Sequence, residues 1–337
     1  MYLDDKEILH LINTQDKAET ENLFAQARKA CEEHYGKSVF FRGLIEFTNY
    51  CKNDCYYCGI RRSNKNVKRY RLSQDEILDC CRIGDKLGYK TFVMQGGEDP
   101  WYTDERIGKV AAAIRLEFPS HAITLSAGER SRSGYELFFQ AGVNRYLLRH
   151  ETADDEHYAK LHPPEMSLAN RKNCLWQLKE IGCHIGAGFM VGTPFQTPDN
   201  LLADLRFLEE LQPQMVGIGP FIPQKDTPFA HECAGNLQLC LKMVALARII
   251  LPKALIPATT AMGTIAPNGR ELALRAGANV VMPNLTPKSA RSLYAIYDNK
   301  ASAGDEAVEI HSSLAEKVRG AGFFPDMSRG DAVSNEE

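Results

Sequence analysis

The feature that most constrains the fold is a repeated alternation of short apolar segments with amphipathic ones from residue 39 onward. Strand-like apolar segments lie at 42–48, 91–95, 122–126, 145–149, 184–191, 215–220, 254–260 and 279–283. Helical spacing is found near 103–117, 131–141, 167–181, 198–211, 237–251 and 268–276. Eight strand–helix units in one chain predict an α/β fold, a (β/α)8 TIM-type barrel. The alternative is a doubly wound open sheet, although eight parallel strands in one open layer are less usual.

The segments that flank the repeats predict three regions along the chain. We expect an N-terminal helical extension at 1–38, the barrel at 39–300, and a C-terminal helix with a flexible tail at 301–337. Lys plus Arg is 40 and Asp plus Glu is 43, and the net charge of −3 gives no reason to expect a nucleic-acid or membrane partner. The chain has no 18-residue apolar run and no apolar signal segment near its start, so we expect a cytoplasmic protein.

Polar residues gather directly after the predicted strands. They include Asn49–Cys51, Gln95–Asp99, Ser126–Glu129 and Arg149–Thr152. In a TIM-type barrel the active site lies at the carboxyl ends of the strands. The pattern therefore indicates an enzyme rather than a purely structural barrel.

Three of the ten cysteines lie within eight residues, directly after the first barrel strand. Cys51, Cys55 and Cys58 place three thiols on one short loop. A structural zinc site takes four ligands, and no Cys or His between Cys58 and Cys80 supplies a fourth. Iron–sulfur clusters also normally take four cysteines, so three predict a cubane whose fourth iron is open to a substrate. A zinc loop completed by a distant residue and a chance grouping of buried cysteines are the alternatives.

The segment EFTNYCKNDCYYCGIRRSN resembles the cluster loop of the radical S-adenosylmethionine (SAM) superfamily. The resemblance implies one [4Fe–4S] cluster held by the three cysteines, with SAM on the open iron and a 5′-deoxyadenosyl radical as the product of SAM cleavage. It also implies that Tyr57 contacts the adenine. QGGED resembles the superfamily's Gly-Gly-Glu segment, in which Gly96, Gly97 and Glu98 lie beside the methionine part of SAM.

Further segments narrow the resemblance. RYLLRHETAD, MVGIGPFIPQKDTP, PATTAMGTI and GANVVMPNLTP are similar to HydE-type maturases of the [FeFe]-hydrogenase H-cluster, which group with biotin synthase and PylB. This resemblance covers about 38–300. It implies work on the diiron subcluster, with a cysteine-bound iron carbonyl–cyanide substrate handed on by a partner maturase. An electron donor such as ferredoxin or flavodoxin is implied as well.

The same resemblance assigns roles to polar residues at the strand ends. Glu151 matches the carboxylate that binds the SAM ribose, and Arg171 matches the arginine that pairs with the SAM carboxylate, which suits the Arg fork. Arg149 matches an anchor for the substrate's carboxylate. The other positions around the implied substrate cavity are Thr124, Ser126, Thr259 and Thr260. A simple rim ion pair is the alternative for Arg149 and Glu151, and an ordinary strand role is the alternative for Thr259 and Thr260.

Three other functions stay open at this point. A PylB-like lysine mutase would use the same barrel and SAM site, a biotin synthase would need further cysteines, and an iron–sulfur or zinc carrier would need none of the strand-end charges. No cysteine follows Cys240, so the accessory cluster of some HydE sequences should be absent. We expect the scattered cysteines to be buried small apolar residues. His150 alternates to the other face of its strand and is expected to be structural.

Overall fold

The computed structural model describes residues 3–300 and 307–333 and contains a parallel barrel. The strands are β1 (Ser38–Phe41), β2 (Gly43–Thr48), β3 (Thr91–Gly96), β4 (Ala122–Ser126), β5 (Arg145–Leu147), β6 (His184–Ala187), β7 (Met190–Val191), β8 (Met215–Val216), β9 (Gly219–Pro220), β10 (Val280–Val281) and β11 (Phe324–Asp326). Six of them form one sheet in the order β2-β3-β4-β5-β6-β8. Parallel bridges Met215–Leu255, Pro257–Val280 and Leu44–Asn284 close the ring. The predicted (β/α)8 barrel is confirmed.

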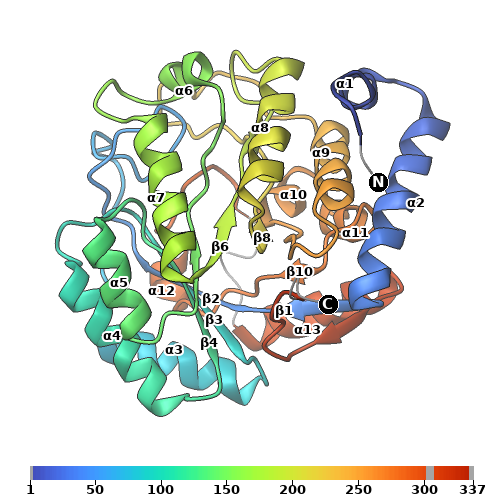
Figure 1. Cartoon of the computed structure of the whole chain (residues 1–337). Helices are drawn as coiled ribbons and strands as arrows, with labels where there is room; N and C mark the ends of the chain where they lie inside the picture. Colours follow the sequence, from blue (N-terminus) through green and yellow to red (C-terminus); the bar gives the residue numbers. More distant parts are fainter. Residues whose placement is uncertain (1–2, 301–306, 334–337) are drawn as a thin grey trace.

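Helices surround the barrel, as Figure 1 shows. They are α1 (Asp5–Asn13), α2 (Lys17–Tyr35), α3 (Gln74–Lys86), α4 (Asp104–Glu117), α5 (Arg132–Gln140), α6 (Asp155–Leu161), α7 (Leu168–Ile181), α8 (Pro198–Leu211), α9 (Leu237–Ile250), α10 (Thr260–Ile265), α11 (Gly269–Arg275), α12 (Lys288–Arg291) and α13 (Ala307–Gly320). The six predicted helices agree with the structure to within a residue at nearly every end. Among the described helices, none combines the length and the apolar character that a membrane span requires.

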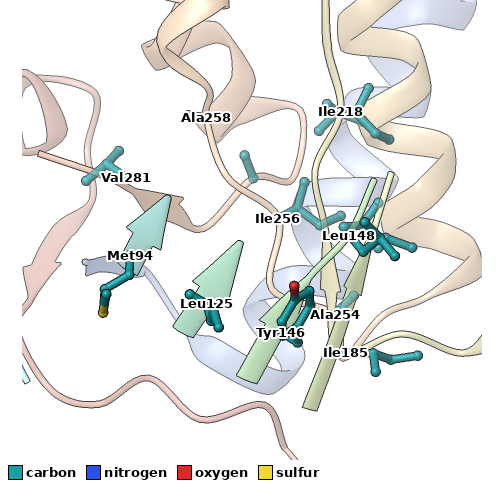
Figure 2. Close-up of a cluster of buried hydrophobic side chains, with 14 of the residues drawn as sticks. Met94, Leu125, Tyr146, Leu148, Ile185, Ile218, Ala254, Ile256, Ala258 and Val281 are labelled. Carbon is teal, nitrogen blue, oxygen red and sulfur yellow. The ribbon is translucent and has the colours of Figure 1, made fainter. Parts of the chain in front are cut away.

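Strand alternation gives the barrel an apolar outer face and an inner face that mixes apolar residues such as Val93 with polar ones such as Thr124. Figure 2 shows Leu125, Tyr146 and Ile185, from three neighbouring strands, in one buried cluster, which belongs to the main core beneath the helices. Because successive side chains of a strand point to opposite faces, Thr124 and Arg149 belong to the inner face. The inner face at the carboxyl ends of the strands is therefore where the site forms.

Three of the predicted strands are interrupted, which corrects the expectation of eight continuous strands. The segment 184–191 splits into β6 and β7 at Gly188, whose φ is 150°, and a Cβ there would lie 2.1 Å from the oxygen of Gly217. The segment 215–220 splits into β8 and β9. The segment 254–260 contributes only the bridges at Leu255 and Pro257. Proline has no N–H to donate, which limits its pairing.

The C-terminal segment closes the bottom of the barrel. β11 pairs in parallel with β1, and the chain then crosses beneath the sheet. Arg145 donates to the oxygen of Arg329 at 2.9 Å and to Oδ1 of Asp331 at 2.7 Å, and Arg42 donates to the oxygen of Gly330 at 3.0 Å. Part of the expected flexible tail is thus bonded to two buried arginines. Residues 301–306 and 334–337, also within that expected region, lie outside the described residues.

The N-terminal helices pack on the outside of the barrel. α1 contacts α8 and α9, and α2 lies along α9. Asp4 forms a capping box with Glu7 at the start of α1, and Asp16 caps α2 by accepting from the amides of Ala18 and Glu19. The predicted N-terminal helices are present, while the domain boundaries themselves stay a prediction.

Candidate active site

The loop that carries the three cysteines is fastened at both ends by one arginine. Nη1 of Arg69 donates to the oxygens of Asn49 at 2.5 Å and Ile60 at 2.8 Å, and Nη2 donates to the oxygen of Arg61 at 2.6 Å. The Asn49 side chain also accepts from the amide of Tyr70 at 2.8 Å. The loop is thus a preformed structure at the mouth of the barrel. Arg69 belongs to the basic stretch that follows the cysteines, and nothing in that sequence pattern indicates that it holds the loop.

The three thiols lie close enough to influence one another. Burial, followed by the charges of Cys58 and Cys51, raises the pKa of Cys55 well above its usual value, and burial raises the pKa of Cys58 to about 12. Buried thiols with raised pKa values stay protonated unless a cationic group binds them, and an iron–sulfur cluster is a group of that kind. In 3–300 and 307–333, no three Cys, His, Asp or Glu side chains are placed to hold a single metal ion.

The other cysteines agree with the sequence expectation in all cases but one. The buried ones are Cys31, Cys80, Cys81, Cys174, Cys183 and Cys240. Cys233 is exposed, which corrects the expectation for that residue. It lies in the loop before α9, where no helix covers its side chain.

Gly97 allows the cluster loop to pack against the end of β3. A Cβ at Gly97 would lie 2.2 Å from the oxygen of Tyr50 and 2.8 Å from Cβ of Cys51. The amide of Lys52 donates to the oxygen of Glu98 at 2.8 Å, which fixes the same contact. The glycine is therefore required by the loop itself. Gly96 is similarly close to Thr48, 2.8 Å from its Cγ2.

Arg171 lies close to two carboxylates, Glu98 after β3 and Glu129 after β4. Its Nε lies 2.7 Å from Oε1 of Glu129, and its Nη2 lies 4.0 Å from Oε1 of Glu98. Burial alone would lower the pKa of Arg171, but the carboxylate of Glu129 holds it well above its usual value. The predicted residues Glu98 and Arg171 are thus brought together. Glu129 was not among the predicted site residues, although its position directly after β4 is the signal that could have found it.

Tyr57 of the cluster loop packs against the ring of His162, which directly follows α6. The Nδ1 of His162 bonds the oxygen of Tyr158 at 3.0 Å, so its Nε2, 3.0 Å from the Tyr57 hydroxyl, is the acceptor. The His162 ring stacks on Tyr158 with centroids 3.9 Å apart. Burial lowers the pKa of His162 to about 3, so the ring is neutral. This bond fixes the orientation of Tyr57, and no sequence pattern indicated His162.

Arg149 and Glu151 follow β5 at the carboxyl end of the barrel. Nη2 of Arg149 lies 3.0 Å from Oε2 of Glu151, but neither atom has hydrogen-bond geometry, and both remain buried without a hydrogen-bond partner. The Oγ1 atoms of Thr124 and Thr259 are also buried and lack a partner. Buried polar atoms are nearly always satisfied, so these unpartnered atoms fit contacts with a polar ligand inside the barrel. Ser126 follows on the inner face of β4, and Thr260 begins α10.

A second polar group lies on the side of the barrel opposite Arg149 and Glu151. It was not predicted from the sequence. Glu46 of β2 accepts from Nδ2 of Asn284 at 2.9 Å and pairs with Nζ of Lys300. Lys300 also lies 4.9 Å from the ring centroid of Tyr294. A glutamate inside an otherwise apolar strand is the signal that could have indicated this group. A separate groove of about 770 Å³, between α1, α2 and the starts of α8 and α9, lies on the outside of the barrel.

Comparison with known proteins agrees with this fold. Residues 45–208 match the family described as the Radical SAM superfamily. The solved structure of methylornithine synthase (PylB) has a TM-score of 0.86 at 28% identity, over 97% of this chain and 95% of that one. The hydrogenase maturase HydG from Carboxydothermus hydrogenoformans has a TM-score of 0.81 at 24% identity, over 96% of this chain and 76% of that one, and shows the fold alone. The fold and the site define a radical SAM enzyme.

Curated relatives place the chain within that class. It is 50% identical over 289 residues to the [FeFe] hydrogenase maturase subunit HydE of Thermotoga maritima, which covers 86% of this chain and 82% of that protein. The 3-methylornithine synthase of Methanosarcina acetivorans is 30% identical over 325 residues, covering 96% and 90%. The chain belongs to the HydE family of the radical SAM superfamily, and the resemblance seen in the sequence is confirmed.

Proposed function

We propose that this protein cleaves SAM reductively and uses the radical in assembling the diiron subcluster of the [FeFe]-hydrogenase active site. The observation that carries the proposal is that the cysteine thiols, Arg171 and Glu151 lie near one another at the carboxyl end of the barrel. The charge of Arg171 acts on Cys55, and the charge of Glu151 acts on Cys58, so the thiols and the proposed SAM residues share one space. When bound, a reduced [4Fe–4S] cluster supplies the electron that breaks the S–C5′ bond of SAM.

The protein's own residues bind and orient SAM in this proposal. Cys51, Cys55 and Cys58 hold the cluster, Arg171 binds the SAM carboxylate, and Glu151 accepts from the ribose hydroxyls. Arg171 lies beside the opposite charge of Glu129, and Glu151 beside that of Arg149, which keeps each near its position before SAM binds. Tyr57 is held by His162 in a position to contact the adenine. The closed barrel bottom keeps solvent away from the reacting atoms.

We propose a cysteine-bound iron carbonyl–cyanide complex as the substrate, anchored by Arg149. The unpartnered hydroxyls of Thr124 and Thr259 support this, because they offer hydrogen bonds inside the barrel. Ser126 and Thr260 are proposed to border the same cavity. The partners would be other hydrogenase maturation proteins, which hand the substrate over, and an electron donor such as ferredoxin or flavodoxin.

The test compares substrates under anaerobic, reducing conditions. We expect the iron complex to stimulate 5′-deoxyadenosine formation and lysine to leave it unchanged. The likeness to 3-methylornithine synthase favours a second candidate, a lysine mutase, and conversion of lysine to methylornithine would establish it instead. A reconstituted protein that never cleaves SAM with a strong reductant would contradict both.

A further inference from the structure

A buried histidine–aspartate pair lies directly behind the cavity residues Arg149 and Glu151. Nε2 of His150 is 3.2 Å from Oδ1 of Asp204 on α8, and both side chains are fully buried. The His150 ring packs on Phe207 with centroids 4.9 Å apart. Strand alternation sends His150 to the outer face of the barrel, so neither partner reaches the cavity. The pair has no role in the chemistry described above.

The hydrogen bonds define which nitrogen of His150 carries the proton. The amide of Gly188 donates to Nδ1 at 3.3 Å, so Nδ1 is an acceptor. Nε2 therefore carries the hydrogen and donates to Asp204. Burial, together with the charges of Arg149 and Lys172, lowers the pKa of His150 well below its usual value and keeps the ring neutral. The pair thus links β6 to α8 through a single ring.

Asp204 forms hydrogen bonds with residues on both sides of Glu151 in the sequence. Its Oδ1 accepts from His150 and from the amide of Ala153, the latter at 2.6 Å. Between these two anchors Glu151 has a φ of 69°. A left-handed backbone is strained for a non-glycine residue and persists only where the surroundings hold it. The amide of Glu151 also donates to the oxygen of Gly188, at 3.0 Å. Gly188, which bonds His150 as well, therefore holds the turn at Glu151 from the side of β6.

We propose that His150 and Asp204 are positioning residues, which hold the strained turn that aims Glu151 and Arg149 into the cavity. Loss of the pair would let the turn relax to an ordinary φ, and the carboxylate of Glu151 would then leave the SAM site. The inference rests on the proposed function, because it takes Glu151 as a SAM ligand.

The test measures SAM affinity and thermal unfolding of the cluster-loaded enzyme. Asp204→Leu removes both acceptor contacts, and we expect SAM affinity to fall about tenfold, which is the size of one lost buried hydrogen bond. Asp204→Asn keeps an acceptor oxygen and should restore most of that affinity. Thr197→Ala removes the N-cap of α8 and is the matched control, since it should lower the melting temperature by a few degrees without changing SAM affinity.

A double-mutant cycle separates positioning from general destabilisation. In a Glu151→Ala background, Asp204→Leu should have no further effect on SAM affinity, because the group that it positions is gone. Independent, additive losses would overturn the proposal, as would unchanged affinity in folded Asp204→Leu protein. If that variant does not fold, His150→Phe keeps the packing on Phe207 and loses both hydrogen bonds, so the same cycle applies. Failure of the unmodified enzyme to bind SAM would instead contradict the proposed function.

Discussion

Nε of Arg171 on α7 lies 2.7 Å from Oε1 of Glu129, so the arginine proposed to bind SAM is held by a carboxylate that follows β4. Both side chains are largely buried, at 9% and 18% exposure. Breaking one side of such a pair leaves the other charge poorly compensated. The pair therefore makes the SAM site depend on a residue that does not itself need to touch SAM.

Substitution of either partner should weaken SAM binding to different degrees. Arg171→Ala removes the proposed ligand to the SAM carboxylate, at a cost of about 1.5–3 kcal/mol, or roughly ten- to a hundredfold in affinity. Glu129→Gln keeps the shape and loses the charge, so a smaller loss is expected. Equilibrium SAM binding measures both. Equal, unchanged affinity in the two variants would mean that the pair is only structural.

The cysteine loop should bind one cluster and no more. We expect about 4 iron per chain after anaerobic reconstitution, because three thiolates on one loop leave the fourth iron open. Cys58→Ala should abolish most of this iron, whereas Cys233→Ser, at an exposed position outside the site, should retain it. Iron and sulfide analysis decides the matter. A reproducible value near eight iron would reveal a second cluster.

Gly97→Ala should disrupt the cluster loop. The added Cβ would lie 2.2 Å from the backbone oxygen of Tyr50, so the loop must move away from β3. We expect a marked loss of bound iron and a lower melting temperature. Gly320→Ala is the matched control, since a Cβ there meets nothing within 4 Å and alanine favours a helix. Full iron content in Gly97→Ala would show that the loop tolerates the shift.

Acid should weaken the closure of the barrel bottom. Partial burial favours the neutral form of Asp331, but hydrogen bonds from Arg329 and Arg145 lower its pKa to about 2. Because the folded pKa lies below the unfolded one, the stabilisation is complete above about pH 4 and is lost as the pH falls through 2. Solvent screening limits it to about 1 kcal/mol. Asp331→Asn should remove this part of the acid dependence in chemical unfolding curves, and identical curves would contradict it.

Local pattern in the sequence determined the class of fold and the place of the chemistry. Alternation between apolar and amphipathic segments predicted the barrel and most helix ends, because the two hydrophobic periods reflect backbone geometry that each segment carries by itself. The spacing of Cys51, Cys55 and Cys58 located the cluster loop, since all three lie within eight residues of the sequence. The same alternation correctly separated His150 from Arg149.

Only the tertiary structure decided the partners of these residues. Glu129 beside Arg171, His162 beside Tyr57 and Lys300 beside Glu46 each join residues more than 40 positions apart, so no local pattern records their contact. The splitting of the strand at Gly188 depends on the backbone of Gly217, which packs against it. The position of the residues near Asp331 beneath the barrel depends on two buried arginines, Arg42 and Arg145, which are far from it in the sequence. Such contacts arise from the assembly of the whole barrel, because each needs a partner that the local chain does not contain.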